Sequence, residues 1–102
     1  MRFIEEIAVD DFLPTLRSML AEALRERGLT QAEVADALGI SQSAVSKYAH
    51  GEVHRHPRIL EDDRVGDLVE RIADGLADGD MTPVQALIEI EIFIRQLERG
   101  DL

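Results

Sequence analysis

Apolar residues recur at helical spacing along most of the chain, which predicts a protein built of helices. The pattern predicts a first helix over about 11–27, two short helices within 30–50, an amphipathic helix over 64–77 and a last helix starting near Thr82. Five or six helices and no clear strand result, so we expect an all-α fold. Residues 87–94 also alternate as a strand would, but helix signals at both ends of the last segment favour a helix.

Local signals mark the ends of these helices. Asp11 can cap the first helix with Pro14 in its first turn, and Gly28 is expected to end it. Glycine is also expected to end the helices before Gly39 and Gly79. Three further helix starts carry capping residues. Thr30 with Glu33 and Thr82 with Gln85 have the spacing of a capping box, and Ser41 is a good N-cap. Pro83 then occupies the first position of the helix that Thr82 caps.

Residues 30–50 predict two short helices joined by a sharp turn, and the second helix has a small polar outer face. Val34, Ala35 and Leu38 face inward from the first helix, and Ala44, Val45 and Tyr48 from the second. Four side chains remain on the outer face, namely Gln42, Ser43, Ser46 and Lys47. Gln can form hydrogen bonds with adenine, Ser with several base edges, and Lys with guanine or a phosphate. This face therefore suits the major groove of DNA.

A solvated face of no function is the alternative for this segment. Solvated helix faces are usually rich in Glu, however, and this Glu-rich chain has no acidic residue between Asp36 and Glu52. We therefore favour DNA binding.

The spacing of Gln31, Ala35, Gly39 and Val45 resembles the helix-turn-helix of the phage-repressor-like (Xre-type) family. The resemblance implies a λ-repressor-like fold, with Gln31 on a phosphate and the bases contacted by Gln42, Ser43, Ser46 and Lys47; Ser41, at the start of that helix, joins them as a candidate contact. Residues 12–17 and 39–48 more specifically resemble archaeal regulators in which a thiamine-phosphate-synthase-like domain often follows. Some of those relatives carry a Cys pair, and this chain has no Cys.

The net charge of −10 opposes DNA binding, but the charge is unevenly distributed. Residues 28–58 are neutral, whereas 1–27 carry −2 and 59–102 carry −8. Lys47 is the only Lys beside ten Arg and 21 acidic residues, which resembles proteins of salt-loving archaea; codon bias towards Arg is the alternative. Concentrated salt would screen the repulsion between acidic protein and phosphate, since the Debye length is about 3 Å at 1 M.

Residues 52–58 predict a basic loop directly after the second short helix. Arg55 and Arg58 are the candidates for phosphate contacts, and His50 and His54 are weaker ones. His54 and His56 also form a His-x-His pair, but two imidazoles without Cys make a poor zinc site, so we expect no metal.

The last helix has more apolar residues than one small domain can bury. Val84, Leu87, Ile88 and Ile94 fall on one face, while Ile90, Phe93 and Leu97 spread onto a second. We expect an interface here: a homodimer through 64–99 would give two recognition helices for a palindromic operator. Docking onto a following domain is the alternative.

The expected organisation is a DNA-binding core over 1–58 and an acidic helical extension over 59–102. The absence of a phosphate loop, of Cys and of a Ser–His arrangement argues against an enzyme, and we expect no cofactor. No segment predicts a membrane span or a secretory signal, so we expect a cytoplasmic protein.

We therefore expect the chain to act in a transcription regulator that binds a specific sequence of double-stranded DNA. The chain is expected to be the N-terminal part of a larger protein. The resemblance implies that an effector such as a thiamine phosphate would bind a domain outside this chain. A protein-interaction adaptor or antitoxin, using the acidic C-terminal surface, is the alternative.

Overall fold

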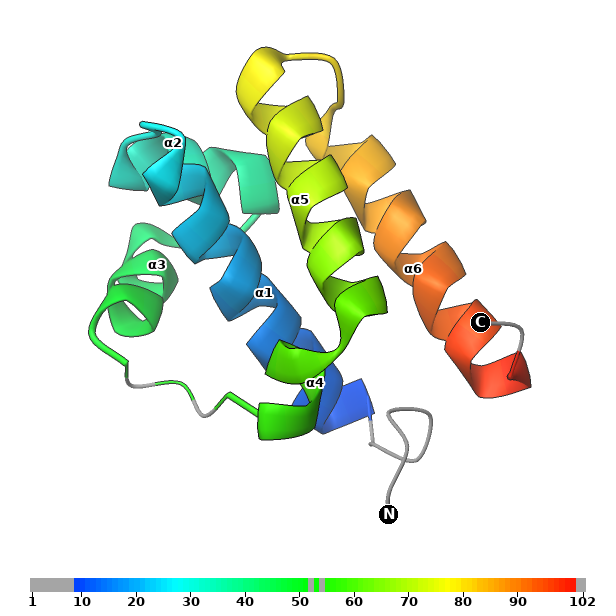
Figure 1. The fold of residues 1–102 in the computed structure, drawn as a ribbon. Helices are drawn as coiled ribbons and strands as arrows, with labels where there is room; N and C mark the ends of the chain where they lie inside the picture. Colours follow the sequence, from blue (N-terminus) through cyan, green and yellow to red (C-terminus); the bar gives the residue numbers. More distant parts are fainter. Residues whose placement is uncertain (1–8, 52, 54, 101–102) are drawn as a thin grey trace.

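The computed structural model describes residues 9–51, 53 and 55–100, and within these residues the chain forms six helices and no strand (Figure 1). The helices are α1 (Val9–Glu26), α2 (Gln31–Leu38), α3 (Gln42–Ala49), α4 (Pro57–Glu61), α5 (Asp63–Asp78) and α6 (Pro83–Arg99). The expected all-α fold is confirmed, and residues 87–94 are helical within α6. No helix among the described residues is both long and apolar enough to cross a membrane.

Most of the expected helix ends are confirmed by hydrogen bonds between capping side chains and the backbone, and by the conformation of the terminal glycines. The Glu33 N–H donates to Thr30 Oγ1 at 3.1 Å, and the Thr30 N–H donates to Glu33 Oε1 at 2.9 Å, which completes a capping box for α2. Thr82 and Gln85 form the same arrangement at the start of α6. Gly39 has φ 66°, a left-handed conformation that favours glycine, and this allows the sharp turn between α2 and α3.

Two expected boundaries are wrong. The first helix begins at Val9, so Asp11 lies within it and Pro14 lies inside the helix instead of in its first turn. The loop expected over 52–58 is shorter, because α4 begins at Pro57 with His56 as its N-cap. Asp62 caps the next helix by accepting hydrogen bonds from the N–H groups of Arg64 and Val65.

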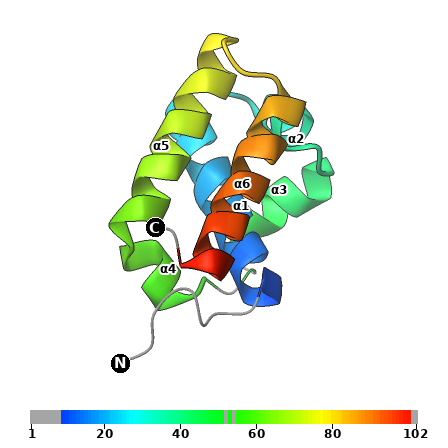
Figure 2. The ribbon, with the colours of Figure 1, turned by 90° about the vertical axis from the view of Figure 1, so that its right-hand side faces the viewer.

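Helix α1 lies at the centre of the fold, between the α2–α3 pair on one side and α5 on the other (Figures 1 and 2). Its buried residues Leu16, Leu20 and Leu24 are fully inaccessible to solvent. A single apolar core joins α1 to every other helix, with Val34, Ala35, Val45, Ile59, Val65, Leu68, Ile72, Ile90 and Phe93 among its members. All six helices therefore contribute to the apolar core against which α2 and α3 pack.

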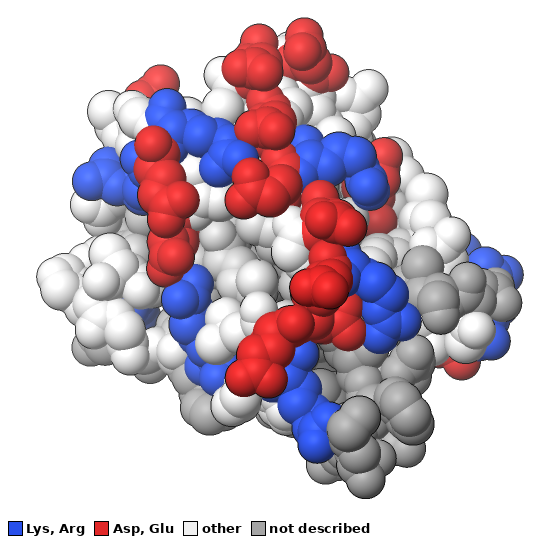
Figure 3. Space-filling model, viewed as in Figure 1, with Lys and Arg blue, Asp and Glu red and all other residues white. Residues whose placement is uncertain are grey.

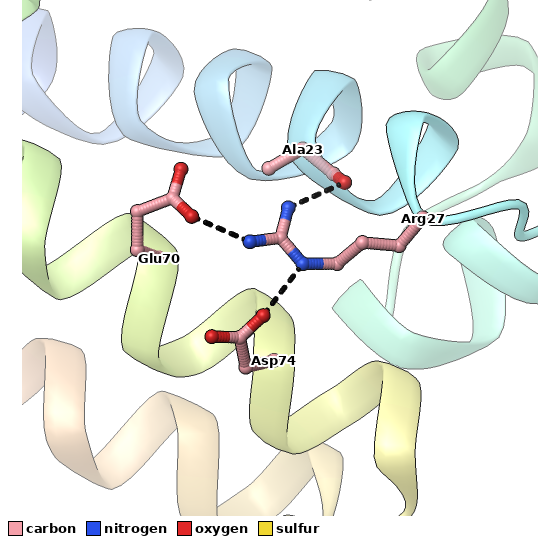
Figure 4. A network of polar contacts seen from close by, with 4 residues as sticks. All are labelled: Ala23, Arg27, Glu70 and Asp74. Atoms are coloured by element: carbon pink, nitrogen blue, oxygen red, sulfur yellow. Dashed lines mark hydrogen bonds and ion pairs between the residues drawn. The ribbon is translucent and has the colours of Figure 1, made fainter.

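Arg27 fastens the end of α1 to α5 (Figure 4). Its Nε donates to Asp74 Oδ1 at 2.8 Å, its Nη2 to Glu70 Oε2 at 2.6 Å, and its Nη1 to the Ala23 carbonyl oxygen at 2.9 Å. The hydrogen bonds to the Asp74 and Glu70 carboxylates raise the pKa of Arg27 above its usual value. The guanidinium thus uses its planar fork to hold three acceptors at once.

Helix α6 buries one of its two apolar faces. Ala86, Ile90, Phe93 and Leu97 are buried, and the Phe93 ring stacks on that of Phe12 with centroids 6.0 Å apart. The opposite face leaves four large apolar residues exposed, which are Val84, Leu87, Ile88 and Ile92. We call these four the α6 stripe. Ile94, which was expected on that face, is only half-buried and packs against the core.

Candidate nucleic-acid interface

Helix α3 presents the polar face that its sequence predicts. Val45 is buried, and Ala44 and Tyr48 are half-buried beneath the helix. On the outer side Gln42, Ser43 and Lys47 are exposed, and Ser46 is half-buried. We call Gln42, Ser43, Ser46 and Lys47 the recognition face. Ser41 is exposed, and its Oγ accepts a hydrogen bond from the Ala44 N–H at 3.1 Å, so its hydroxyl serves as the N-cap of the helix.

Gln31 connects the two helices of the pair. It is the first residue of α2, and its side-chain Nε2 donates to the backbone carbonyl oxygen of Gln42, the first residue of α3, at 2.9 Å. Gln31 is itself exposed, so its side chain lies at the surface where the two helix starts meet. The hydrogen bond leaves the Gln42 side chain available for other contacts.

His50 ends α3 with one ring nitrogen already engaged. Its Nδ1 lies 2.8 Å from the Ser46 carbonyl oxygen and 3.3 Å from Ser46 Oγ. A carbonyl oxygen can only accept, so Nδ1 must carry the proton and donate. Nε2 of this exposed residue is then left as the nitrogen that can meet a ligand.

The segment after α3 is attached to α1 by two buried hydroxyl groups that the sequence analysis did not single out. The His56 N–H donates to Thr15 Oγ1 at 2.9 Å, and Arg55 Nε donates to Ser18 Oγ at 2.6 Å. Thr15 and Ser18 are 0% and 3% exposed. Their signal is a pair of hydroxyl residues three apart within the apolar surface of α1, where unpartnered polar groups would be costly.

The two arginines proposed for phosphate contacts lie in different environments. Arg55 is half-buried, and beyond Ser18 its Nη1 pairs with Glu22 Oε2 at 3.1 Å. Arg58 is exposed on α4. His54 lies outside the described residues, so both its phosphate role and the His-x-His hypothesis stay untested.

Acidic side chains are displaced from the recognition face. In Figure 3 most of the Asp and Glu side chains form a band over α5, and a second, smaller acidic group lies further to the left. The outermost surface at the left edge, where α3 lies, shows no acidic side chain in this view. Helix α3 itself contains Lys47 and no acidic residue. The local charge at this face is therefore far less negative than the net charge of −10.

Two helices at a tight glycine turn, supported by a third helix and presenting small polar side chains, form the unit that enters a DNA groove in helix-turn-helix proteins. Comparison with protein families agrees. Residues 20–61 match the helix-turn-helix family. The match runs from the second half of α1 to the end of α4 and includes the whole recognition face. No curated protein and no solved structure gives a significant match.

The matched part of the chain is thus similar to a type of domain that binds DNA in transcription regulators and is not typically enzymatic. It does not extend to α5 or α6.

Proposed function

We propose that this protein is a transcription regulator that binds a specific double-stranded DNA sequence, with α3 as the recognition helix in the major groove. The observation that carries the proposal is the recognition face. Gln42 and Ser43 are exposed at the start of α3 and Lys47 is exposed in its last turn, in a stretch without acidic residues. Each can bond a base edge, and a good bidentate contact is worth about 1–3 kcal/mol of discrimination.

Phosphate contacts would surround this face. Gln31 at the start of α2 and Arg58 on α4 are exposed, and His50 offers Nε2 from the end of α3. We assign Arg55 a different part. Because its guanidinium contacts Ser18 and Glu22, it would position the segment between α3 and α4 and leave the phosphates to its neighbours.

Few cations are available to a single copy. The segment 28–58 contains three Lys or Arg residues, and one of them, Arg55, contacts α1. Since phosphate contacts supply much of the affinity of DNA-binding proteins, one copy would bind weakly. We therefore propose that two copies bind a palindromic operator, and that concentrated salt in the cell of a salt-loving archaeon screens the remaining repulsion.

The wider setting is proposed from the sequence resemblance alone. There the chain would be the DNA-binding part of a larger archaeal regulator of thiamine biosynthesis genes, and a thiamine phosphate would act on a separate ligand-binding domain. A supporting result would be a selected operator that recurs upstream of thiamine biosynthesis genes in haloarchaeal genomes.

In vitro selection of double-stranded DNA tests the main proposal. The chain is incubated with a random duplex library in about 2 M KCl, where screening is strong, and the retained DNA is sequenced. An enriched palindrome with half-sites about one helical turn apart is expected. A folded protein that enriches no motif would overturn the proposal.

Substitution of the recognition face then separates direct base contacts from other causes. Gln42→Ala is expected to weaken binding to the selected site by about 1–3 kcal/mol for the lost base contact. Gln96→Ala, at a half-buried position of α6 outside the recognition face, is the matched control and should leave the discrimination between the selected site and a scrambled duplex unchanged.

A protein-interaction adaptor is the second candidate, and the acidic surface of α5 favours it. Exposed acids follow one side of this helix, namely Asp63, Asp67, Glu70, Asp74 and Asp78. An adaptor that uses this surface would be indifferent to Gln42→Ala, so the same variant distinguishes the two functions.

A further inference from the structure

Among the described residues, four of the five large apolar side chains that remain exposed belong to the α6 stripe. Val84 and Leu87 are 67% and 63% exposed, and Ile88 and Ile92 are 51% and 49% exposed. The spacing of three and four residues places all four on one side of the helix. Contiguous apolar surface of this kind on a small protein usually marks an interface.

An apolar hollow continues the stripe towards the DNA-binding part. It encloses about 360 Å³ and is lined on one side by Val84 and Leu87 of α6. Its other side is formed by Leu38 and Ile40 at the α2–α3 turn, and by Arg17 of α1. Whatever covers the stripe at this end therefore also touches the turn that sets the position of α3.

We propose that the α6 stripe is covered by the α6 stripe of a second copy, in an antiparallel pair whose two-fold axis passes near Ile88. This rests on the proposed function in one respect, the need for two recognition helices. It goes further by naming the surface, the register and the contact with the α2–α3 turn.

The spacing within the stripe carries the register. Val84 and Ile92 lie four residues on either side of Ile88, so an antiparallel two-fold at Ile88 places Val84 of each copy against Ile92 of the other. Ile88 of one copy then contacts Ile88 of the other at the axis. Val84, Ile88 and Ile92 each gain an apolar partner in this arrangement, as a self-complementary interface requires.

Charge favours the antiparallel direction. The charged residues that continue this face, Glu91 and Arg95, form an ion pair at 2.7 Å within one copy. A parallel pair would bring each of them against the same residue of the second copy, and like charges opposite one another are unfavourable. The antiparallel pair separates them and keeps the stripe neutral, although each chain carries −10.

The same register would also fill the apolar hollow beside the stripe. Val84 lies at its edge, so Ile92 of the second copy would enter it beside Leu38 and Ile40. Glu91 of the second copy would arrive near Arg17, the exposed cation at the rim. Pairing of the copies would thus bear directly on the α2–α3 turn and fix the two recognition helices relative to each other.

Single cysteines test this interface without DNA, because the natural chain contains none. A disulfide needs Cα atoms about 4.4–6.8 Å apart, so only residues next to the axis can link to themselves. Under mild oxidation in about 2 M KCl, Ile88→Cys is expected to form a covalent dimer in most of the protein. Leu60→Cys is the matched control, since Leu60 is an exposed aliphatic residue, 41% accessible, on α4.

A mixture of Val84→Cys and Ile92→Cys chains tests the direction. The antiparallel pair predicts cross-links between the two variants and few within either, whereas a parallel pair predicts the reverse. Cross-linking of Ile88→Cys no faster than that of Leu60→Cys would overturn the interface. Circular dichroism of each variant confirms that the helices are intact.

Failure here is distinguishable from failure of DNA recognition. Cross-linked dimers that select no DNA motif would keep the interface and remove the proposed function. An enriched motif together with uncross-linked Ile88→Cys would keep the function and remove this interface.

Discussion

The side chain of Gln31 donates to the backbone carbonyl oxygen of Gln42 at 2.9 Å, so the first residue of α2 holds the first residue of α3. The contact joins the two helix starts directly. It fixes the end of α3 from which the recognition face begins, and it does so with a side chain that is itself exposed at the surface.

Removing this hydrogen bond while keeping the volume of the side chain should separate its two roles. Gln31→Met is expected to lower the free energy of unfolding by about 1 kcal/mol, the usual net value of one hydrogen bond. Affinity for the selected operator should fall further, because α3 loses a constraint and DNA loses a contact. Urea unfolding and DNA titration measure the two effects, with Gln96→Met as control. Unchanged DNA affinity would contradict a role for Gln31 at the interface.

Much of the fold could be predicted because its signals are local. The capping boxes at Thr30 and Thr82 and the left-handed Gly39 each depend on residues within a few positions of one another. The recognition face was predictable for the same reason. Once the start of α3 is fixed at Ser41, the helical period alone decides which side chains point outward.

The features that escaped prediction depend on distant residues. Helix α4 has only five residues, and it is held by the bond from the His56 N–H to Thr15 and by the burial of Ile59. The partners of Arg55 lie 33 and 37 residues away on α1. Which apolar face of α6 is buried is decided likewise by contacts such as that between Phe12 and Phe93. Nothing near these residues in the sequence specifies such pairings.

Two glycines within α5 should respond oppositely to the same change. A Cβ at Gly75 would lie 2.8 Å from Met81 Cβ, and the Met81 N–H donates to the Gly75 carbonyl oxygen at 3.0 Å. A Cβ at Gly66 would meet nothing within 4 Å. Gly66→Ala is therefore expected to stabilise the protein by about 0.5–1 kcal/mol through helix propensity.

Gly75→Ala should instead destabilise by about 1–3 kcal/mol, since the α5–α6 connection must move away to make room. Chemical unfolding of both variants in the same buffer measures the difference. Equal stabilisation by the two substitutions would mean that Met81 does not lie against α5.

Acid should destabilise the protein through two capping carboxylates. The hydrogen bond from the Arg64 side chain lowers the pKa of Asp62, and the bond from the Thr30 N–H lowers the pKa of Glu33. A lowered pKa means that the stabilisation is complete above the unfolded-state pKa and is lost as pH falls through the folded-state value. The free energy of unfolding should therefore decline below about pH 4, where unfolded carboxyls begin to protonate.

Asp62→Asn isolates one of these groups. Asn can still cap α5, but it has no charge to lose, so its unfolding free energy should depend less on pH across the acid range than that of the natural protein. Urea unfolding at a series of pH values gives both curves. Parallel curves would show that Asp62 makes no contribution to the acid sensitivity.

Arg27 should contribute more to the free energy of unfolding than an exposed ion pair with a similar N–O distance. Arg27→Lys keeps the charge but cannot hold Ala23, Glu70 and Asp74 together, and we expect a loss of about 1 kcal/mol, moderated by the exposure of both carboxylates. Arg95→Lys is the control. Its partner Glu91 is one helical turn away and both are exposed, so the loss should stay below about 0.5 kcal/mol. A comparable loss in both variants would deny Arg27 a special role.

Arg55 and Arg58 offer the sharpest test of how the protein holds the DNA backbone. A phosphate contact contributes to the slope of log affinity against log salt concentration, and removing one should reduce the slope by about 1. Arg58→Gln is expected to do this with little change in stability, because Arg58 is exposed. Arg55→Gln is expected to leave the slope unchanged and to lower the free energy of unfolding by about 1 kcal/mol, since it loses Ser18 and Glu22.

Ser18→Ala provides the independent check on Arg55, because it removes the same hydrogen bond from the α1 side and touches no cation. It should reproduce the stability loss of Arg55→Gln, and both should weaken DNA binding equally across salt concentrations. A reduced slope for Arg55→Gln with unchanged stability would instead mean that Arg55 leaves Glu22 for a phosphate when DNA binds. Arg55 would then contact the DNA backbone directly instead of only positioning the segment that follows α3.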